Sequence, residues 1–329
     1  MTIITFPLSE MTAAHPHLRR FDLRRDLDAV ATLVEECFSS TLDADGKRYV
    51  RQMRNTAQHP QFLRWAANMA ERMSVPFNGF VWEQDGRVVG NLSLIPMHTR
   101  GRKIYLIANV AVHADFRRKG IARSLTEAAL DECRRKRAHQ IWLHVRQDNP
   151  GAQQLYEGLG FVERARRTQW YSNPLEGTRP SGSRPPVKGV SLQERRPAHW
   201  FQQLAWMNEL HPELLEWYLP LNVNSLRPGL AGWFYRMLTG TLPRQWSALW
   251  NDRLLGVAAW VRSNASADRL WLAAHPEGET IAIRELLPLV QEKVGRRPFN
   301  VEYPAGRADE AFRAAGFEEH QTLIWMEYR

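Results

Sequence analysis

The sequence predicts an α/β protein made of two related domains in tandem. The chain has 329 residues, which is enough for two domains with a sizeable core in each. Apolar runs of strand length, rich in β-branched residues, are followed by stretches whose apolar residues recur at helical spacing. Segments of the first half also recur, in the same order, in the second half.

The clearest strand-to-helix unit lies in the first half. Residues 105–112 form a short apolar run, and a helical stripe of apolar residues starts at Ile121. The loop between them carries three cationic and two small residues, which are Arg117, Arg118, Lys119, Gly120 and Ala122. A helix start leaves N–H groups unpaired and carries partial positive charge, so it attracts phosphate. Gly120 lets a phosphate approach the backbone because it has no Cβ. The pattern predicts a diphosphate site, although similar turns also serve as ordinary connections.

The elements around this unit follow from periodicity and from turn residues. In chain order we expect a strand at 18–23, a helix at 24–40, further helical structure at 41–74, a hairpin at 80–95 about Asp85–Gly86, a strand at 141–145, a helix from Asn149–Pro150 to Gly160, and a last strand at 161–171.

The second half repeats the first in altered form. Residues 176–189 lie in a stretch rich in Gly, Pro and Ser, which is the composition of a linker. Beyond it, residues 249–260 are similar to the hairpin and residues 271–275 to the central strand. Residues 308–319 match residues 152–163 most clearly. Chance similarity between two α/β units would not readily give three pairs of similar segments in the same order.

The second copy differs from the first where a phosphate would bind. The acidic stretch Pro276–Glu279 stands in place of the basic loop, and Phe312 stands in place of Tyr156. We therefore expect a degenerate domain that is structural or that shapes an acceptor site.

Two motifs resemble those of the GCN5-related N-acetyltransferase (GNAT) superfamily. Arg117-x-x-Gly120-x-Ala122 is similar to the loop that binds the acetyl-CoA pyrophosphate in that family. The family's second motif is matched by Asn149, Ala152, Leu155, Tyr156, Gly160 and Phe161. The two motifs stand in the family's order and separation, and the resemblance covers roughly residues 18–172.

The resemblance implies a fold and a function for the whole chain. It implies two tandem GNAT-like domains, each a mixed, mostly antiparallel sheet flanked by helices: a catalytic domain at 1–175, a linker at 176–189 and a degenerate domain at 190–329. It implies an acetyl-CoA-dependent N-acetyltransferase whose N-terminal domain moves an acetyl group to a primary amine by direct attack in a ternary complex. The alternative is a non-catalytic protein that senses acyl-CoA or binds a partner.

The resemblance also implies roles for particular residues. The cofactor pyrophosphate would lie on the N–H groups of Arg117, Arg118, Lys119, Gly120, Ile121 and Ala122, and the pantetheine arm beside Val110, Ala111 and Val112. Tyr156 is the expected general acid, because a phenol keeps its proton at pH 7, or else it only packs on the cofactor. Asn149 is expected to contact the cofactor, to cap its helix, or both.

The general base stays open. Family members often carry a glutamate on the strand before the loop, and this chain has Asn109 and His113 in that neighbourhood. His113, His98, Asp115 or a chain of waters could accept the proton, although a lone histidine is more often structural.

Composition narrows the partners and the compartment. The net charge is +9, but the basic residues are scattered and carry no nucleic-acid-binding signature, so we expect an anionic cofactor and no nucleic acid. No apolar run is long enough to span a membrane, and no signal peptide is evident. Cys37 and Cys133 lack the spacing of metal ligands. We expect a cytoplasmic protein with no metal and no membrane partner, acting on a small-molecule or peptide amine.

Aromatic residues are concentrated in the second half. They are Trp200, Phe201, Trp206, Trp217, Tyr218, Trp233, Phe234, Tyr235, Trp246 and Trp250. An aromatic ligand box is one interpretation, but filling of the core and of a domain interface is the more common role, and we expect that role here.

Overall fold

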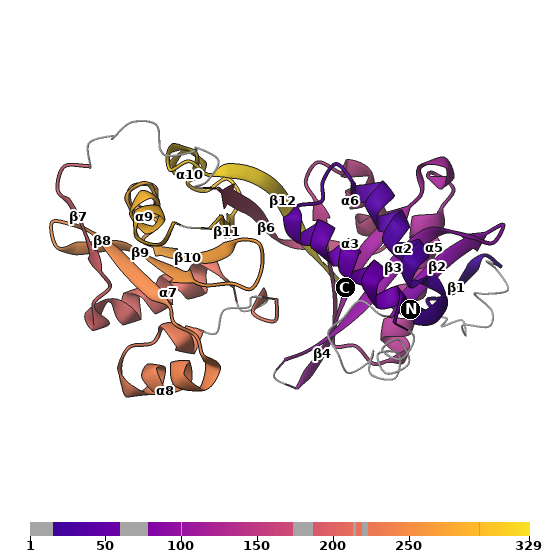
Figure 1. Cartoon of the computed structure of the whole chain (residues 1–329), viewed down its shortest axis with the longest axis horizontal. Helices are drawn as coiled ribbons and strands as arrows, with labels where there is room; N and C mark the ends of the chain where they lie inside the picture. The colour runs from indigo at the N-terminus through magenta and orange to yellow at the C-terminus, as the bar shows by residue number, and fades with distance from the viewer. Residues whose placement is uncertain are drawn as a thin grey trace. The chain divides into compact units, whose positions relative to one another are not determined.

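The chain forms two compact units (Figure 1). The computed structural model describes residues 16–59, 78–99, 101–173, 187–212, 215–218, 223–295 and 297–329. Unit 1 is Met1–Arg164 together with Ile324–Arg329, and unit 2 is Ala165–Leu323. The helical structure predicted for residues 60–74 and most of the predicted linker lie outside the described residues.

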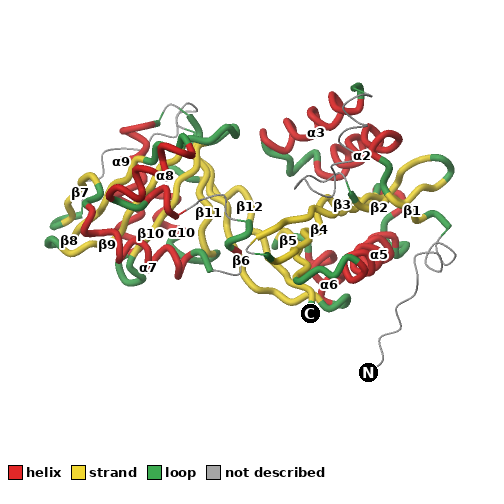
Figure 2. Tube along the Cα trace, turned by 90° about the horizontal axis from the view of Figure 1, so that it is seen from below, coloured by secondary structure: helices red, strands yellow, loops and turns green. Residues whose placement is uncertain are grey.

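Unit 1 is a mixed, mostly antiparallel sheet with helices on both faces. In chain order its elements are β1 (Leu18–Arg20), α2 (Leu23–Phe38), α3 (Ala44–Ala57), β2 (Gly79–Gln84), β3 (Arg87–Thr99), β4 (Arg102–Val112), η1 (Ala114–Phe116), α5 (Ile121–Arg135), β5 (Gln140–Arg146) and α6 (Pro150–Glu157). Strands β1 to β4 pair antiparallel, and β4 pairs parallel with β5. Figure 2 shows α2 and α3 on one face of this sheet and α5 and α6 on the other. The fold class expected from the sequence is confirmed.

Local sequence explains these elements. Asp22 caps α2 by accepting a hydrogen bond from the N–H of Arg24, and the helix buries an apolar stripe against the sheet. Asp85 and Gly86 both have positive φ, which is the backbone that a tight β2–β3 hairpin requires. Cys133 is buried on α5, as a packed thiol should be, and Cys37 is half-buried on α2.

The C-terminal strand β12 (Glu318–Tyr328) extends the sheet of unit 1. It lies next to β5 in the strand order. Its residues Ile324 and Met326 belong to the apolar core of unit 1, and the ring of Trp325 lies 4.9 Å from that of His144. The end of the chain therefore belongs to the first compact unit.

Unit 2 repeats the order of strands and helices. Its elements are β7 (Val190–Glu194), η2 (Pro197–His199), α7 (Trp200–Leu210), η4 (Val223–Leu226), α8 (Gly229–Thr239), β8 (Arg244–Trp250), β9 (Arg253–Val261), β10 (Asp268–Ala274), α9 (Glu279–Val294), β11 (Phe299–Pro304) and α10 (Asp309–Ala314). Strands β7 to β10 pair antiparallel, and β10 pairs parallel with β11. The predicted hairpin at residues 249–260 is the β8–β9 hairpin.

The compact units differ from the predicted domain boundaries at two strands. The prediction placed residues 1–175 in one domain and 190–329 in the other. Strand β6 (Phe161–Ser172) passes from unit 1 to unit 2 after Arg164, and its later residues pair with β11. Strand β12 passes the other way after Leu323. The physical reason is that, in the strand order, β12 lies beside β5 and β6 lies beside β11, so the fifth strand of each unit has a neighbour from the other half of the sequence.

The aromatic residues singled out in unit 2 range from buried through half-buried to exposed. Trp200 and Trp246 are buried, as expected. The expectation of core filling is wrong for four other members, because Phe201, Trp233, Phe234 and Trp250 are exposed. No helix in the described part of the chain is long and apolar enough to cross a membrane.

Candidate functional site

The loop before α5 has the backbone that the sequence predicts for anion binding. Gly120 precedes the helix with φ +81° and ψ −4°, and Arg118 also has positive φ. A Cβ on Gly120 would meet no atom within 4 Å, so the left-handed backbone, and not crowding, favours glycine there. The first bond of the helix runs from the N–H of Ser124 to the carbonyl of Gly120, at 3.0 Å. The preceding N–H groups, including those of Ile121 and Ala122, have no intrahelical partner, and within the described residues no side chain caps them.

The basic side chains of this loop have different roles. The Nε of Arg117 donates to the carbonyl of Val112 at 3.1 Å, so this arginine ties the loop to β4. The Nζ of Lys119 lies 4.9 Å from the centre of the Phe116 ring. Arg118 and Lys119 are exposed beside the free N–H groups. They are the cations best placed to meet a phosphate at the start of α5.

Strands β4 and β5 separate beside this loop. Their parallel pairing runs from Ile104–Gln140 to Ile107–Leu143, whereas β4 continues to Val112 and stays paired with β3. Within the described residues, the stretch that includes Val110 and Ala111 therefore has no strand partner on the β5 side. Such an edge can receive the amides of an extended ligand. The carbonyl of Val112 already accepts bonds from Arg117 and from the Sγ of Cys37, the latter at 3.4 Å.

A β-bulge marks the middle of the unpaired stretch. Asn109 and Val110 face the one residue Leu92 on β3, and Asn109 has φ +52°. The Nδ2 of Asn109 donates to Tyr49 Oη at 3.2 Å and to Ser93 Oγ at 3.3 Å. Bulges often redirect a side chain beside an active site. Here the bulge gathers a neutral polar cluster of Asn109, Tyr49 and Ser93.

Sequence reasoning did not single out Tyr49 or Ser93. Tyr49 lies on α3, sixty positions before Asn109 in the numbering, and no sequence spacing signals that they meet. Burial raises the pKa of Tyr49 to about 12, so its hydroxyl keeps its proton at neutral pH. The sequence does single out Asn109, because it lies in the neighbourhood where family members often carry a glutamate base.

Tyr156 and Asn149 lie on α6. Tyr156 is 6% exposed and its ring meets Phe161 edge to face, with centroids 5.9 Å apart. Burial raises the pKa of Tyr156, which favours the protonated phenol. The Oδ1 of Asn149 accepts from the N–H of Ala152 at 3.2 Å, so Asn149 is the N-cap of α6.

The histidines considered as bases lie in different places. The Nδ1 of His113 accepts from the N–H of Asp115 at 3.3 Å and so caps η1, while its Nε2 is 3.8 Å from Glu36 Oε2. His98 pairs with Lys103, six residues before Asn109 on β4. His113 thus has a structural role, and His98 lies away from the bulge.

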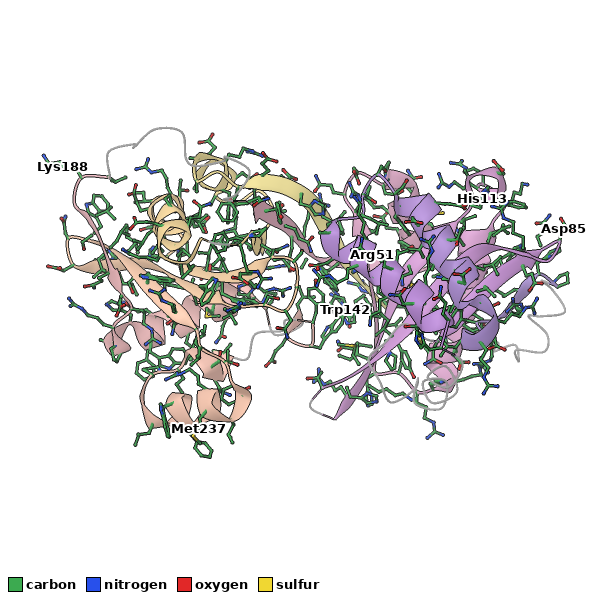
Figure 3. All side chains as sticks on the ribbon, viewed as in Figure 1. Arg51, Asp85, His113, Trp142, Lys188 and Met237 are labelled. Carbon is green, nitrogen blue, oxygen red and sulfur yellow. The ribbon has the colours of Figure 1, made fainter. Side chains whose placement is uncertain are left out.

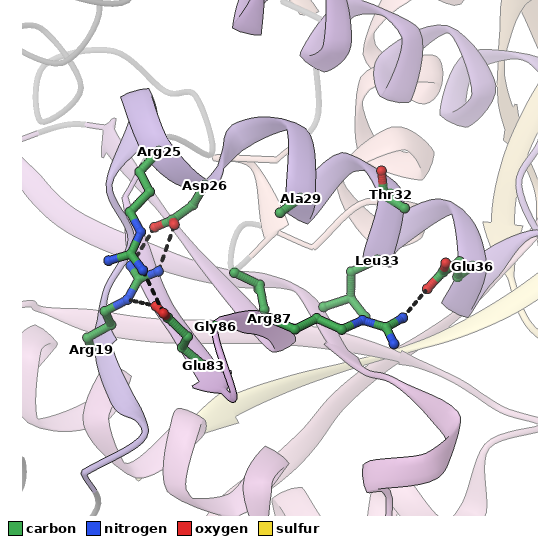
Figure 4. Close-up of a pocket in the computed structure, with 11 residues that line it drawn as sticks. Arg19, Arg25, Asp26, Ala29, Thr32, Leu33, Glu36, Glu83, Gly86 and Arg87 are labelled. Carbon is green, nitrogen blue, oxygen red and sulfur yellow. Dashed lines mark hydrogen bonds and ion pairs between the residues drawn. The ribbon is translucent and has the colours of Figure 1, made fainter.

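A charged hollow with a volume of about 310 Å³ also occurs in unit 1, between α2 and the β2–β3 hairpin (Figure 4). Arg19 contacts Asp26 and Glu83, at 2.6 Å each, and Arg25 contacts Glu83 at the same distance. Arg87 lies 3.8 Å from Glu36. The charges of this hollow pair with one another, and none of its lining residues belongs to the α5 loop. We therefore interpret it as a set of ion pairs that joins α2 to the β2–β3 hairpin.

The equivalent helix start in unit 2 carries a carboxylate that neighbouring side chains engage. Gly278 precedes α9 with φ −111°, and Glu279 follows it. The carboxylate of Glu279 accepts from Tyr303 Oη at 2.9 Å and from Arg307 Nη2 at 2.7 Å. Phe312, the counterpart of Tyr156, is fully buried and stacks on Trp170. This copy is degenerate where unit 1 carries the motifs.

Comparisons with known proteins agree with this geometry. Residues 30–161 match the family described as the acetyltransferase (GNAT) family. The chain is 41% identical over 63 residues to the [ribosomal protein bS18]-alanine N-acetyltransferase of Escherichia coli K12, covering 19% of this chain and 43% of that protein. It is 37% identical over 67 residues to the N-alpha-acetyltransferase 30 of Saccharomyces cerevisiae, covering 20% and 38%. These matches span less than half the length of either relative.

Solved structures match nearly the whole chain. One of them is the GCN5-related N-acetyltransferase of Sphaerobacter thermophilus, with a TM-score of 0.54 and 12% identity over 94% of this chain and 95% of that one. Residues 30–161, which lie within unit 1, are therefore similar to the GNAT family, and unit 2 repeats the order of strands and helices of unit 1.

Proposed function

We propose that the protein is an acetyl-CoA-dependent N-acetyltransferase and that unit 1 carries the reaction. The observation that carries this proposal is the free helix start at Gly120–Ala122 beside a β4 edge that β5 leaves unpaired. The helix start supplies N–H groups and partial positive charge for a diphosphate. The open edge supplies backbone groups for an extended arm with amides.

The residues present fit the donor. The N–H groups of Ile121 and Ala122 would hold the pyrophosphate, with Arg118 and Lys119 adding charge, and the edge at Val110 and Ala111 would hold the pantetheine arm. Bound there, acetyl-CoA supplies an activated acyl group. The chain's task is to hold the thioester, receive a neutral amine and provide a proton for the departing thiolate.

Tyr156 is the proposed proton donor. Its raised pKa keeps the hydroxyl protonated at neutral pH, and within the described residues no hydrogen bond engages that hydroxyl. A protonated phenol can give its proton to the departing thiolate, and the proton that the attacking amine loses as the amide forms restores the phenol, so the products are the acetylated amine and the free thiol.

The proposed acceptor is a primary amine that attacks directly in a ternary complex. The cluster of Asn109, Tyr49 and Ser93 lies at the bulge and offers neutral hydroxyl and amide groups to it. Two relatives are named for alanine and N-alpha acetylation. An α-amino group of a peptide is therefore the first acceptor to test, followed by small-molecule amines.

Two measurements on the full chain test the proposal. Calorimetry with coenzyme A and with acetyl-CoA should show one binding site per chain. Incubation of acetyl-CoA with peptides and small amines should release free thiol in step with acetylated amine. Absence of binding would refute the proposal; binding without thiol release across the amine panel would favour a non-catalytic acyl-CoA sensor.

A further inference from the structure

Helix α8 of unit 2 presents its apolar side chains to solvent. The large apolar residues of this face are between 53% and 86% exposed, and they are Leu230, Trp233, Phe234, Met237 and Leu238. Their spacing of three and four residues places them on one side of the helix. Figure 3 shows Met237 on the outer side of α8. A helix on a soluble domain normally turns such a face inward, so α8 has the reverse orientation.

The opposite side of α8 attaches the helix to unit 2. Gly232 is buried, and a Cβ there would lie 1.8 Å from the carbonyl oxygen of Arg227, so the helix backbone packs directly on the preceding loop. The Nη1 of Arg236 donates to the carbonyls of Ser225 at 3.2 Å and of Arg227 at 2.9 Å. The helix is thus held by a glycine contact and a guanidinium, which leaves its apolar side free.

A basic hollow adjoins this helix. It has a volume of about 370 Å³, and four arginines from before, within and after α8 line it: Arg195, Arg227, Arg236 and Arg244. Among its described lining residues, Glu194 is the one carboxylate. Burial and the charge of Arg236 both lower the pKa of Arg195, and the Nε of Arg195 is buried without a hydrogen-bond partner. The four arginines against one carboxylate give the described lining of the hollow an excess of positive charge.

We propose that α8 and the arginine hollow form a docking surface for an anionic lipid bilayer. A helix with Trp, Phe and Leu on one side, accompanied by basic residues, is the pattern that lies in the interfacial region of a membrane. The exposed arginines of the hollow, Arg227 and Arg244, would meet the phosphate and carboxylate groups of anionic lipids. With 11 residues, α8 is too short to cross a bilayer, which takes about 20.

Charge favours this occupant over a second copy of the chain. Symmetric pairing of two α8 helices would bring the arginines of both hollows towards one interface, where like charges repel. An anionic surface turns the same charges into attraction. The proposal concerns unit 2 and does not depend on the reaction of unit 1.

Sedimentation of the full chain with lipid vesicles tests the proposal. One set of vesicles contains phosphatidylcholine alone, and the other contains phosphatidylcholine with one quarter phosphatidylserine. We expect roughly tenfold or greater preference for the anionic vesicles. Trp233→Asp should weaken that binding by roughly tenfold or more, because it places a charge on the inserting face. Arg227→Gln and Arg244→Gln should each weaken it about fivefold, and added salt should do the same.

Trp250→Asp is the matched control. Trp250 is 47% exposed and ends β8, the strand that Arg244 begins, so it lies away from the hollow. Its substitution should leave vesicle binding unchanged, and circular dichroism should show that every variant is folded.

Four results would overturn the proposal. They are equal binding to both kinds of vesicle, binding to neither, a concentration-dependent dimer that Trp233→Asp abolishes, and calorimetric binding of inorganic phosphate without any binding to vesicles.

Discussion

Helices α5 and α9 begin at equivalent places in the two units, yet the side chains beside the first start are cationic and the second start carries a carboxylate. At α5, Gly120 has a left-handed backbone, the side chains nearby are cationic, and the N–H groups are free. At α9, the Glu279 carboxylate occupies the first turn and bonds Tyr303 and Arg307. A helix start attracts an anion in either case. The comparison teaches that the anion near an equivalent helix start can be an external ligand in one copy of a duplicated fold and the protein's own carboxylate in the other.

The largest expected effect comes from a substitution at the start of α5. Gly120→Glu would place a carboxylate where phosphates are proposed to bind and would force a side chain into a backbone with φ +81°. We expect calorimetry to show acetyl-CoA affinity reduced at least about a hundredfold. Gly101→Glu is the control, because Gly101 also has positive φ and open space around a Cβ. Equal loss in both variants would mean general damage to unit 1.

The next effect separates Tyr156 from its counterpart Phe312. Tyr156→Phe should lower the rate of acetyl transfer by about 10²–10⁴-fold and leave acetyl-CoA affinity nearly unchanged, since proton transfer by a positioned group contributes that much. The raised pKa of Tyr156 predicts the sign of the pH profile. The phenol stays protonated beyond pH 10, so this group should cause no fall in rate below about pH 10. An unchanged rate in the variant would leave Tyr156 a packing residue.

A third prediction removes the negative charge at the start of α9. Glu279→Gln removes the charge that Arg307 and Tyr303 meet, and we expect it to destabilise unit 2 by about 1–3 kcal/mol. Thermal unfolding would measure this. Glu277→Gln, at an exposed neighbour, should have little effect. Acetyl-CoA affinity should be the same in both variants; a change in that affinity would show that α9 contributes to donor binding.

The smallest effect concerns the caps of α6 and α10. Asn149 caps α6 with its side chain, whereas Ala308 precedes α10 with no side-chain cap. Asn149→Ala should reduce stability by about 1 kcal/mol, the usual value of an N-cap. Measuring acetyl-CoA affinity in the same variant separates the two proposed roles: an unchanged affinity means a cap alone, and a weaker affinity means a cofactor contact as well. Asn149→Asp, which retains a capping oxygen, should restore stability.

Features with local causes could be predicted well from sequence. The turn at Asp85–Gly86 and the helix starts at Gly120 and Asn149 depend on the backbone preferences of a few neighbouring residues. The replacement of the basic loop by an acidic stretch ending at Glu279 could likewise be predicted by comparing the two halves of the sequence. The precise partners of Glu279 could not, because Tyr303 and Arg307 reach it from β11 and from the turn beyond it.

The sequence by itself determined the kind of fold, the position of the open helix start and the degeneration of its second copy. Only the tertiary structure decided that β12 joins unit 1, that Tyr49 meets Asn109 at a bulge, and that α8 turns its apolar side outward. The physical reason is the range of the interactions. Backbone geometry and capping act between neighbours in sequence, whereas strand pairing and burial are set by residues far apart along the chain.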